Sequence, residues 1–317
     1  MQTNRNLIFM KDKIVVIGSS NVDLIMKMEH LPEKGETVTN GVFMQVYGGK
    51  GANQAVAAAR AGGNVAFISC VGKDAYTPQM VQNYKTDGID TRFVFSEKDV
   101  ASGCALILIG QTGENMIAVA PGANYRLTPE KVDEAAELFD EATMIVLQFE
   151  VEEKTVKHIL ELANKKKVPV MWNVAPARAF DFSLIQKVNI LVLNEVEAGF
   201  LAGIPVENES DAGLAAQKLV DKGVEKVIIT LGSKGAFVLT KTEKVSVPAF
   251  KVSAIDTTAA GDTFCGAFAV ALVEGRPLKD SLLFASAAAA ISVTRLGAQP
   301  SAPTRAEIDA FLKNHLL

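Results

Sequence analysis

Runs of apolar, β-branched residues alternate with helix-like segments over most of this 317-residue chain. Lys13–Gly18 is the first such run, the Ala-rich segment Gly51–Ala61 favours a helix, and Val65–Val71 is again strand-like. Further strands are predicted at Thr143–Phe149, Val168–Val174, Ile190–Asn194 and Val227–Leu231. Strands that are apolar throughout indicate a parallel sheet, because helices must cover both of its faces. The sequence therefore predicts an α/β fold, a three-layer α/β/α sandwich with a mostly parallel central sheet.

Two regions interrupt this alternation, since Thr37–Tyr47 and Val94–Ala120 carry strand-like segments with no intervening helix. In the second region, Gly103–Ile109 and Asn115–Ala120 flank a polar turn that contains glycine, which is the pattern of a β-hairpin. Such segments do not fit easily into a sheet whose parallel strands are joined by helices. We expect them to form a small inserted β-sheet that serves as a lid or as a dimer surface.

The expected domain organisation follows from this pattern. The lid strands are predicted at about 19–27, 37–48 and 94–120. Residues 13–317 would form a single domain, preceded by an N-terminal extension of residues 1–12. The edges of the lid sheet would expose unpaired strand groups, a hazard that pairing with a second subunit removes. We therefore expect a homodimer that forms through the lid strands.

Composition and charge exclude several classes of protein. The net charge of −4 provides no positive surface for nucleic acid, and no apolar run approaches the roughly 18–20 residues that cross a bilayer. Cys70, Cys104 and Cys265 are widely spaced among apolar neighbours, which favours buried free thiols in a reducing compartment over a zinc site or disulfides. We expect a cytoplasmic globular protein without a nucleic-acid or membrane partner.

Residues 255–264 have the character of an anion-binding site. The small residues Ala259, Ala260 and Gly261 lead into Asp262, and an apolar, helix-like stretch follows. The start of a helix directs unpaired N–H groups and positive dipole charge at one point, and small side chains let a phosphate approach the backbone. A carboxylate there can take a proton from an attacking hydroxyl, which favours phosphoryl transfer. An ordinary helix start capped by Asp262 fits these residues equally well.

Two motifs with polar side chains are candidates for binding a hydroxylated ligand. In Gly48–Gln54, the backbone would form a collar from which Lys50 and Asn53 donate hydrogen bonds. The motif matches neither a P-loop nor a dinucleotide fingerprint, and a glycine-rich helix entry is the alternative. After the first strand, Asn21 and Asp23 are suited to a sugar diol, although an Asx turn would also explain them.

Other polar residues follow predicted strands, at the edge where open parallel sheets bind ligands. Glu150 directly follows one strand. Asn194 and Glu197 follow another and open a helix, where Asn194 would cap the helix or, with Glu197, reach a metal–phosphate group. Thr230–Gly235 is either a simple turn or a glycine loop against the phosphates and ribose of a nucleotide. Because the three histidines lie outside the glycine-rich segments, a Ser–His–Asp triad is poorly supported.

Together and in this order, these motifs resemble the ribokinase family of sugar and nucleoside kinases, from about Lys13 to the C-terminus. The segments that carry the resemblance are Gly18–Asp23, Gly48–Gln54, Asn194–Glu197, Thr230–Gly235 and Asp256–Asp262. The resemblance implies that Asp262 is the catalytic base and that Ala259–Gly261 form the anion hole around the transferred phosphoryl group. The sequence departs from the widespread form of the family motif at Ala259, where glycine is usual.

The other residues implied by the resemblance fall into three sets. Those matching sugar-binding positions are Asn21, Asp23, Gly49, Lys50, Asn53, Glu150 and Asp262. Those matching nucleotide-binding positions are Asn194, Thr230, Gly232, Ser233, Lys234, Gly235, Gly261 and Ser286. Those matching ligands of an activating potassium ion are Asp256, Thr258, Ser292, Arg295, Gly297 and Ser301, several through backbone carbonyls. Glu197 would hold Mg²⁺ through water, and Ser286 stands near the adenine where we would expect Asn or His.

The activity implied by the resemblance is ATP-dependent phosphorylation of D-ribose at O5, with Mg²⁺ on the phosphates and K⁺ as a monovalent activator. A weak base such as an aspartate at a helix start suffices, because phosphoryl transfer passes through a loose transition state in which positioning and charge stabilisation dominate. Two alternatives stay open. The substrate could be deoxyribose, a ketohexose such as fructose, or a nucleoside such as adenosine, or the chain could be a non-catalytic sugar or nucleotide sensor.

Overall fold

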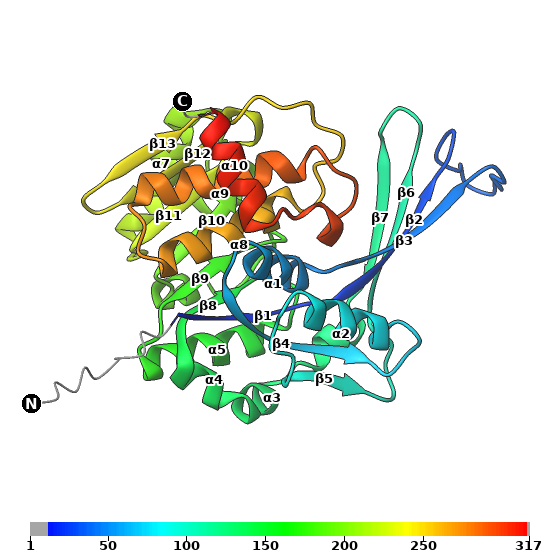
Figure 1. Cartoon of the computed structure of the whole chain (residues 1–317), viewed down its shortest axis with the longest axis horizontal. Helices are drawn as coiled ribbons and strands as arrows, with labels where there is room; N and C mark the ends of the chain where they lie inside the picture. The colour runs from blue at the N-terminus through cyan, green and yellow to red at the C-terminus, as the bar shows by residue number, and fades with distance from the viewer. Residues whose placement is uncertain (1–11, 316–317) are drawn as a thin grey trace, which may run out of the picture.

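A nine-stranded sheet forms the centre of the molecule in the computed structural model, which describes residues 12–315 (Figure 1). Its strand order is β13-β12-β11-β10-β9-β8-β1-β4-β5. The strands are β1 (Lys13–Ile17), β4 (Asn64–Gly72), β5 (Val94–Glu97), β8 (Ala142–Leu147), β9 (Val170–Asn173), β10 (Ile190–Asn194), β11 (Lys226–Thr230), β12 (Ala236–Thr240) and β13 (Lys244–Val247). Neighbours from β5 to β11 pair in parallel, whereas β12 and β13 pair antiparallel. The predicted mostly parallel central sheet is confirmed.

Helices cover both faces of this sheet. On one face lie α1 (Lys50–Arg60), α2 (Thr77–Thr86), α8 (Ala260–Val273), α9 (Leu278–Ser292) and α10 (Arg305–His315). On the other lie α3 (Pro129–Glu134), α4 (Ala136–Glu141), α5 (Glu153–Lys166), α6 (Glu195–Ala202) and α7 (Glu209–Asp221). Successive residues of β1 point to opposite faces, so Val15 and Ile17 pack in one core and Ile14 and Val16 in the other. The predicted three-layer sandwich is therefore confirmed.

Short 3₁₀ turns lie in the connections: η1 (Gly122–Arg126), η2 (Phe182–Lys187), η3 (Gly232–Lys234) and η4 (Gln299–Ser301).

A second, four-stranded sheet projects from one end of the main body, with the order β3-β2-β6-β7 (Figure 1). Its strands are β2 (Asn21–Lys27), β3 (Val42–Gly48), β6 (Gly103–Ile109) and β7 (Asn115–Ala120). The antiparallel pairing of β6 with β7 confirms the predicted hairpin. The chain enters this sheet directly after β1 and leaves it through Gly49 into α1, and Asn21 pairs with Gly48. The start of β2 and the end of β3 therefore lie where the two sheets join.

One strand expected in the lid lies elsewhere. Residues 94–97 form β5, which pairs in parallel with the edge of the main sheet, Ser69 beside Val94, and not with the second sheet. The expectation that all of 94–120 joins the lid was therefore wrong. Helix α2, which the sequence pattern did not indicate, supplies the crossover that parallel pairing of β4 and β5 requires. The expected extension, residues 1–12, lies outside the described residues apart from Asp12.

The three- and four-residue spacing of Val132, Ala135, Ala136 and Phe139 predicts a single amphipathic helix, but the structure divides it into α3 and α4. The break is at Ala135, whose φ of −96° and ψ of 10° leave the helical range. Both Val132 and Phe139 are still fully buried in the same core, so the expected apolar face is kept.

Among residues 12–315, no helix is both long enough and apolar enough to cross a bilayer.

Candidate active site

Helix α8 begins with a turn that no side chain caps within residues 12–315. Its N-cap residue, Ala259, has a left-handed backbone with a φ of 58°, which costs a non-glycine residue roughly 1 kcal/mol. Gly261 faces open space, since a Cβ there would meet no atom within 4 Å. Gly261 is also exposed, so its amide is accessible to an anion, whereas the amide of Ala260 makes a long hydrogen bond of 3.3 Å to the carbonyl of Thr257.

Asp262 lies in the first turn of α8, where it is buried and hydrogen-bonded through both carboxylate oxygens. Oδ1 accepts from Nε2 of Gln54 at 2.9 Å, and Oδ2 accepts from Nδ2 of Asn53 at 3.0 Å. Helices α1 and α8 approach closely here, because a Cβ on Gly266 would lie 2.7 Å from the carbonyl oxygen of Gln54. The carboxylate therefore contacts α1 and does not cap its own helix, so the simple capping interpretation does not hold.

The glycines of Gly48–Gln54 stand where backbone segments come close together. A Cβ on Gly51 would lie 2.6 Å from the carbonyl carbon of Gly18. Gly49 has a φ of 88°, and a Cβ on it would lie 2.8 Å from the amide nitrogen of Asn21. The glycines therefore open helix α1, as the helix-entry interpretation predicts, and they bring its first turn against the end of β1.

The N-terminus of α1 is capped from elsewhere in the chain. Oε2 of Glu150 accepts from the amide of Lys50 at 3.0 Å and from the hydroxyl of Ser19 at 2.5 Å. The hydroxyl oxygen of Ser19 in turn accepts from the amide of Gly51 at 3.2 Å. A negative charge at a helix N-terminus is favourable. Glu150, expected as a sugar ligand, therefore holds α1 in place.

Charged side chains influence one another strongly where the sheets join. Burial, together with the negative charges of Glu150 and Asp262, raises the pKa of Asp23 to about 7. Burial opposes the charge of Lys50, but the carboxylates of Asp262, Glu150 and Glu197 outweigh it and raise its pKa above the ordinary value. Lys50 therefore stays cationic among carboxylates, while Asp23 titrates near neutral pH. Carboxylates accept hydrogen bonds from hydroxyl groups, so this arrangement suits a polyol.

Asn21 is oriented by a residue that the sequence pattern did not indicate. Nδ2 of Asn124, in η1, donates to Oδ1 of Asn21 at 2.7 Å, and Oδ1 of Asn124 accepts from the amide of Ser20 at 2.9 Å. Asn21 and Asn124 are both buried. Because Asn124 occupies the oxygen of Asn21, the Nδ2 group is the end of Asn21 that can meet a ligand.

The expected nucleotide positions come from the ends of β10 and β11, where Asn194 and Thr230 pair in register. Asn194 caps α6, since its Oδ1 accepts from the amide of Glu197 at 2.8 Å and Oε2 of Glu197 accepts from the Asn194 amide at 2.9 Å. This capping box confirms the cap interpretation of Asn194. Burial raises the pKa of Glu197, and the Asn194 hydrogen bond and the charge of Lys50 oppose that rise.

The turn Thr230–Gly235 connects β11 to β12 through η3. Gly232 and Gly235 have φ values of 52° and 110°, in the left-handed region that favours glycine. The ammonium group of Lys234 donates to the carbonyl of Glu207. Ser286 is buried on α9, and no hydrogen bond within residues 12–315 joins it to this turn.

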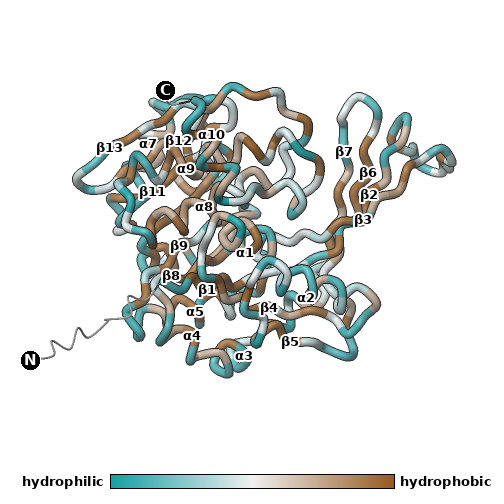
Figure 2. Tube along the Cα trace, viewed as in Figure 1, coloured by the Kyte–Doolittle hydropathy of each residue, from teal (hydrophilic) through white to brown (hydrophobic). Residues whose placement is uncertain are grey.

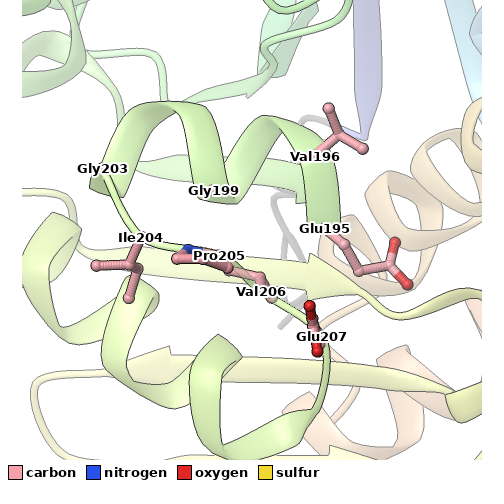
Figure 3. A pocket seen from close by; sticks show the side chains of 8 residues that line it. All are labelled: Glu195, Val196, Gly199, Gly203, Ile204, Pro205, Val206 and Glu207. Carbon is pink, nitrogen blue, oxygen red and sulfur yellow. The ribbon is translucent and has the colours of Figure 1, made fainter.

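A surface hollow of about 500 Å³ lies between the start of α6 and the loop that follows this helix (Figure 3). It is lined by Glu195, Val196, Gly199, Gly203, Ile204, Pro205, Val206 and Glu207. Glu195 and Glu207 bring two carboxylates to this place, which disfavours phosphate groups because like charges repel. The hollow is therefore distinct from the anion site at the start of α8.

Most of the residues expected to bind potassium lie in two loops joined by Asp256, whereas Ser292 ends α9 and Ser301 lies in η4. Its Oδ1 accepts from the amide of Thr258 and its Oδ2 from the amide of Gly297, both at 2.9 Å. Burial opposes the charge of Asp256, but these hydrogen bonds outweigh it and keep its pKa below the ordinary value. Asp256 therefore stays ionised and fixes the spacing of the two loops.

The remaining potassium candidates can contribute mainly through the backbone. The guanidinium of Arg295 pairs with Glu307 at 2.6 Å, and the hydroxyls of Ser292 and Ser301 donate to local carbonyls. Within the described part of the chain, no three His, Cys, Asp or Glu side chains gather into a metal site. The donors that these loops offer are carboxylate and carbonyl oxygens, which suit hard cations.

Three buried amide side chains at the centre of the site were not among the predicted site residues. Nε2 of Gln54 donates to Oδ1 of Asn173 at 3.1 Å as well as to Asp262. Nε2 of Gln148 donates to Oε1 of Gln54 at 2.7 Å. Gln148 and Asn173 stand at the carboxyl ends of β8 and β9, so a polar residue at the end of an apolar strand was the signal that could have identified them.

Known proteins resemble this chain over nearly its whole length. Residues 11–305 match the family described as pfkB family carbohydrate kinase. A ribokinase of Haemophilus influenzae is 41% identical over 305 residues, which cover 96% of this chain and 100% of that protein. A deoxyribokinase of Salmonella typhimurium is 40% identical over 300 residues, with coverage of 94% and 98%.

Solved structures agree with this relationship. A ribokinase from Thermotoga maritima has a TM-score of 0.86 at 40% identity, with 95% of this chain and 99% of that chain covered. Arabidopsis thaliana ribokinase, solved with ribose and ATP, has a TM-score of 0.90 at 33% identity, with coverage of 96% and 99%. The chain belongs to the pfkB family of carbohydrate kinases.

Proposed function

We propose that the protein transfers the γ-phosphoryl group of ATP to O5 of D-ribose. The observation that carries this proposal is the accessible start of α8 beside Asp262, whose carboxylate is held by Asn53 and Gln54. This arrangement supplies an anion hole and a proton acceptor at one place. Similarity to ribokinases, including one solved with ribose and ATP, supports ribose as the acceptor.

The proposed reaction divides the work between Asp262 and the backbone before it. Asp262 accepts the proton of the sugar hydroxyl while that oxygen attacks the γ-phosphorus, and the bond to the bridging oxygen of ADP breaks. Amides of the segment Ala259–Gly261 stabilise the negative charge on the transferred group. A strong base is not needed, because charge stabilisation dominates in a loose transition state. The four-stranded lid would exclude water from the sugar and so limit hydrolysis of ATP.

The proposed sugar site lies where β2 and β3 meet α1. Asp23 and Glu150 would accept hydrogen bonds from sugar hydroxyls, and Nδ2 of Asn21 and the ammonium of Lys50 would donate to them, beside the backbone of Gly49. Oδ1 of Asn53 supports this placement, since it is buried and has no hydrogen-bond partner within residues 12–315. Buried polar atoms are rarely left unpaired, so a sugar hydroxyl would satisfy it.

The proposed cofactor positions follow from the donors present. Glu197 already accepts from the Asn194 amide, so it fits a contact with Mg²⁺ through water better than a direct one. The ends of β10 and β11 and the turn 230–235 would hold ATP, with Ser286 near the adenine. Asp256 and the carbonyls of its two loops fit K⁺. Bound cations would supply positive charge beside the transferred phosphoryl group.

The experiment that tests the proposal measures ATP consumption by the purified chain with Mg²⁺ and a panel of acceptors. D-ribose should give the highest kcat/KM, and NMR should show the phosphate on O5. Deoxyribose is the second candidate substrate, favoured by the deoxyribokinase relative. If kcat/KM is higher for deoxyribose than for ribose, deoxyribose is the substrate and the ribose proposal is wrong. If no sugar or nucleoside is phosphorylated although ribose and ATP bind, the sensor interpretation replaces the kinase.

Replacement of K⁺ by Na⁺ tests the cation proposal separately. At equal ionic strength, Na⁺ should lower kcat several-fold, because a smaller ion fits a carbonyl cage less well. The Asp256→Asn variant should lose the difference between the two salts, since the charge that fits the cation is gone. Equal rates of the unaltered protein in both salts would remove K⁺ from the proposal.

We also propose a homodimer that forms through one face of the lid sheet. Pairing across the four strands aligns Phe43, Met26, Leu108 and Met116 in one row, and Figure 2 shows apolar residues along these strands. Phe43 and Met116 are 57% and 56% exposed. A hollow of about 640 Å³ lies in the same face. A monomer rarely leaves so continuous an apolar surface in water.

Light scattering on the purified chain tests this dimer. The mass should be that of two chains, and Leu106→Asp on the apolar face should convert it to one. Leu214→Asp on α7, which is similarly exposed but far from the lid, is the matched control and should stay dimeric. A monomeric mass for the unaltered chain at working concentration would contradict the dimer.

We place this activity in a single kinase domain of residues 13–317, with the second sheet as its lid. Cytoplasmic location is also proposed, because Cys70, Cys104 and Cys265 are all free thiols and free thiols persist in reducing compartments. Fractionation of cells that produce the tagged chain tests the location. Recovery in an oxidising compartment would overturn it.

A further inference from the structure

We infer that Gln54 is a positioning residue for Asp262, and that the ends of the central strands orient Gln54 through Gln148 and Asn173. The inference rests on the proposed function, in which Asp262 accepts the sugar proton. It adds a residue whose side chain touches neither of the proposed substrates but fixes the group that reacts.

Every polar atom of the Gln54 side chain is used. Nε2 donates to Asp262 at 2.9 Å and to Asn173 at 3.1 Å, and Oε1 accepts from Gln148 at 2.7 Å. Gln54 is fully buried. Water therefore cannot replace these partners, and loss of any one of them leaves a buried polar group unpaired.

The partners also determine which way the amide of Gln54 points. Nδ2 of Asn173 donates to the carbonyl of Val192 in β10 at 3.1 Å, so the oxygen of Asn173 faces Gln54. If the amide were reversed, its oxygen would face two acceptors, on Asn173 and Asp262, and its nitrogen would face the donor of Gln148. The donor of Gln54 is therefore directed at Asp262 by Gln148 and Asn173 at the ends of β8 and β9, and Asn173 is held in turn by β10.

Asn53, the other donor to Asp262, differs from its neighbour Gln54 in one respect. Its Oδ1 is buried without a partner among the described residues, so in the proposed function Asn53 also serves the sugar. Gln54 has no atom left for a ligand. Both contacts to Asp262 are therefore formed without the sugar, and Gln54 is the donor whose polar atoms are all paired by the protein.

Rotation of a carboxyl group about its last bond is only weakly restricted by its own geometry. The hydrogen bond from Gln54 restricts it here, and the close approach of α1 to α8 at Gly266 keeps the two groups in reach. A reacting group displaced by about 1 Å can lose on the order of 10² in rate. Gln54 therefore acts on kcat through the orientation of Asp262.

The experiment compares Gln54→Met with the unaltered enzyme, because methionine has a similar length and no donor. We expect kcat to fall roughly 10- to 10²-fold while the sugar KM changes less than about threefold. The acid limb of the kcat–pH profile should move to higher pH, since loss of a donor disfavours an ionised carboxylate. A crystal structure should show the Asp262 carboxylate rotated on an unchanged α8 backbone.

The matched control is Thr155→Val in α5. Thr155 is also fully buried and donates to a backbone carbonyl, that of Leu127, at 2.7 Å. This variant should lose a similar amount of thermal stability yet keep kcat and the acid limb. A merely structural role for Gln54 predicts that Gln54→Met behaves in the same way, and that result would overturn the inference.

A second variant keeps the inference testable if Gln54→Met does not fold. Gln148→Met leaves the contact between Gln54 and Asp262 but removes the donor that orients Gln54, so kcat should fall about three- to tenfold. An unchanged kcat would overturn the inference. If the unaltered protein phosphorylates no acceptor, the proposed function fails instead, and the crystal structure of a Gln54 or Gln148 variant still decides whether Asp262 is oriented by this network.

Discussion

The proposed sugar side and the proposed nucleotide side of the candidate site are built differently. On the sugar side, the side chains of Asn21, Asp23, Asn53 and Asp262 are buried. Asn21 is hydrogen-bonded to buried Asn124, and Asn53 is hydrogen-bonded to Asp262. The negative charge of Asp262 contributes to the raised pKa of Asp23. On the nucleotide side, residues 232–234 are exposed, and left-handed glycines shape the turn. The sugar side would therefore contact its ligand through hydrogen-bonded side chains, and the nucleotide side would contact its ligand mainly through the backbone.

This difference implies unequal sensitivity to substitution. Removal of one member of a buried network leaves its partners unpaired, which is costly. An exposed turn loses little when a side chain is changed, provided that its glycines keep their conformation. Single substitutions on the sugar side should therefore reduce turnover and sugar binding strongly, whereas single substitutions on the nucleotide side should reduce ATP binding only weakly.

The largest effect is expected for Asp262→Asn. An amide cannot accept the sugar proton, so kcat should fall roughly 10²- to 10⁴-fold. The sugar KM should change little, because asparagine keeps the shape of the side chain. Steady-state kinetics with saturating ATP measures both. Retention of more than about a tenth of the original kcat would show that the sugar side does not depend on this carboxylate.

Lys50→Met should produce the next largest effect. Lys50 is the cation among the carboxylates of Asp262, Glu150 and Glu197, and its loss leaves their repulsion uncompensated. We expect kcat/KM for the sugar to fall on the order of 10²-fold. Lys50→Arg is the control that keeps the charge, and it should recover part of the loss. Equal damage from both variants would mean that the shape of Lys50 matters and its charge does not.

Sugar binding should weaken as pH falls through about 7, the pKa of Asp23. Above this pH, Asp23 is ionised and both of its oxygens accept hydrogen bonds from a diol, whereas protonation below it removes the charge and turns one oxygen into a donor. If only the ionised form binds well, affinity should fall about tenfold between about pH 8 and about pH 6. Calorimetry should detect proton release on binding near pH 7, and Asp23→Asn should abolish both effects. The affinity for ATP should not follow this profile.

Much of the fold could be predicted from sequence because strands and helices alternate with clear apolar patterns. Lys13–Gly18 and Ile190–Asn194 are read correctly as buried strands. Two local errors have physical causes. Helix α2 is polar over much of its surface, which concealed the crossover that places β5 in the main sheet. The break falls at Ala135, a fully buried alanine, and because alanine is the best helix former neither composition nor periodicity marks it.

The site was predictable where glycine and charge make a pattern, as at Gly48–Gln54 and Ala259–Asp262. The residues that orient the site's side chains were not predictable. Asn124, Gln148 and Asn173 are common residues in ordinary contexts, and only the meeting of distant strand ends gives them partners. Gln54 lay inside a recognised motif, yet its contact with Asp262 spans 208 residues of sequence and follows from helix packing alone.

The smallest effect is expected for Lys234→Met, the counterpart of the Lys50 variant on the nucleotide side. Lys234 is exposed, and its ammonium donates to the carbonyl of Glu207, not to a buried charge. Water can replace that contact, so the variant should keep its fold and its sugar KM, and the ATP KM should rise less than about threefold. ATP titration of the two lysine variants in parallel measures the contrast directly. If Lys234→Met loses as much as Lys50→Met, the nucleotide side also depends on a charged side chain, and the distinction between side chains on one side and backbone on the other does not hold.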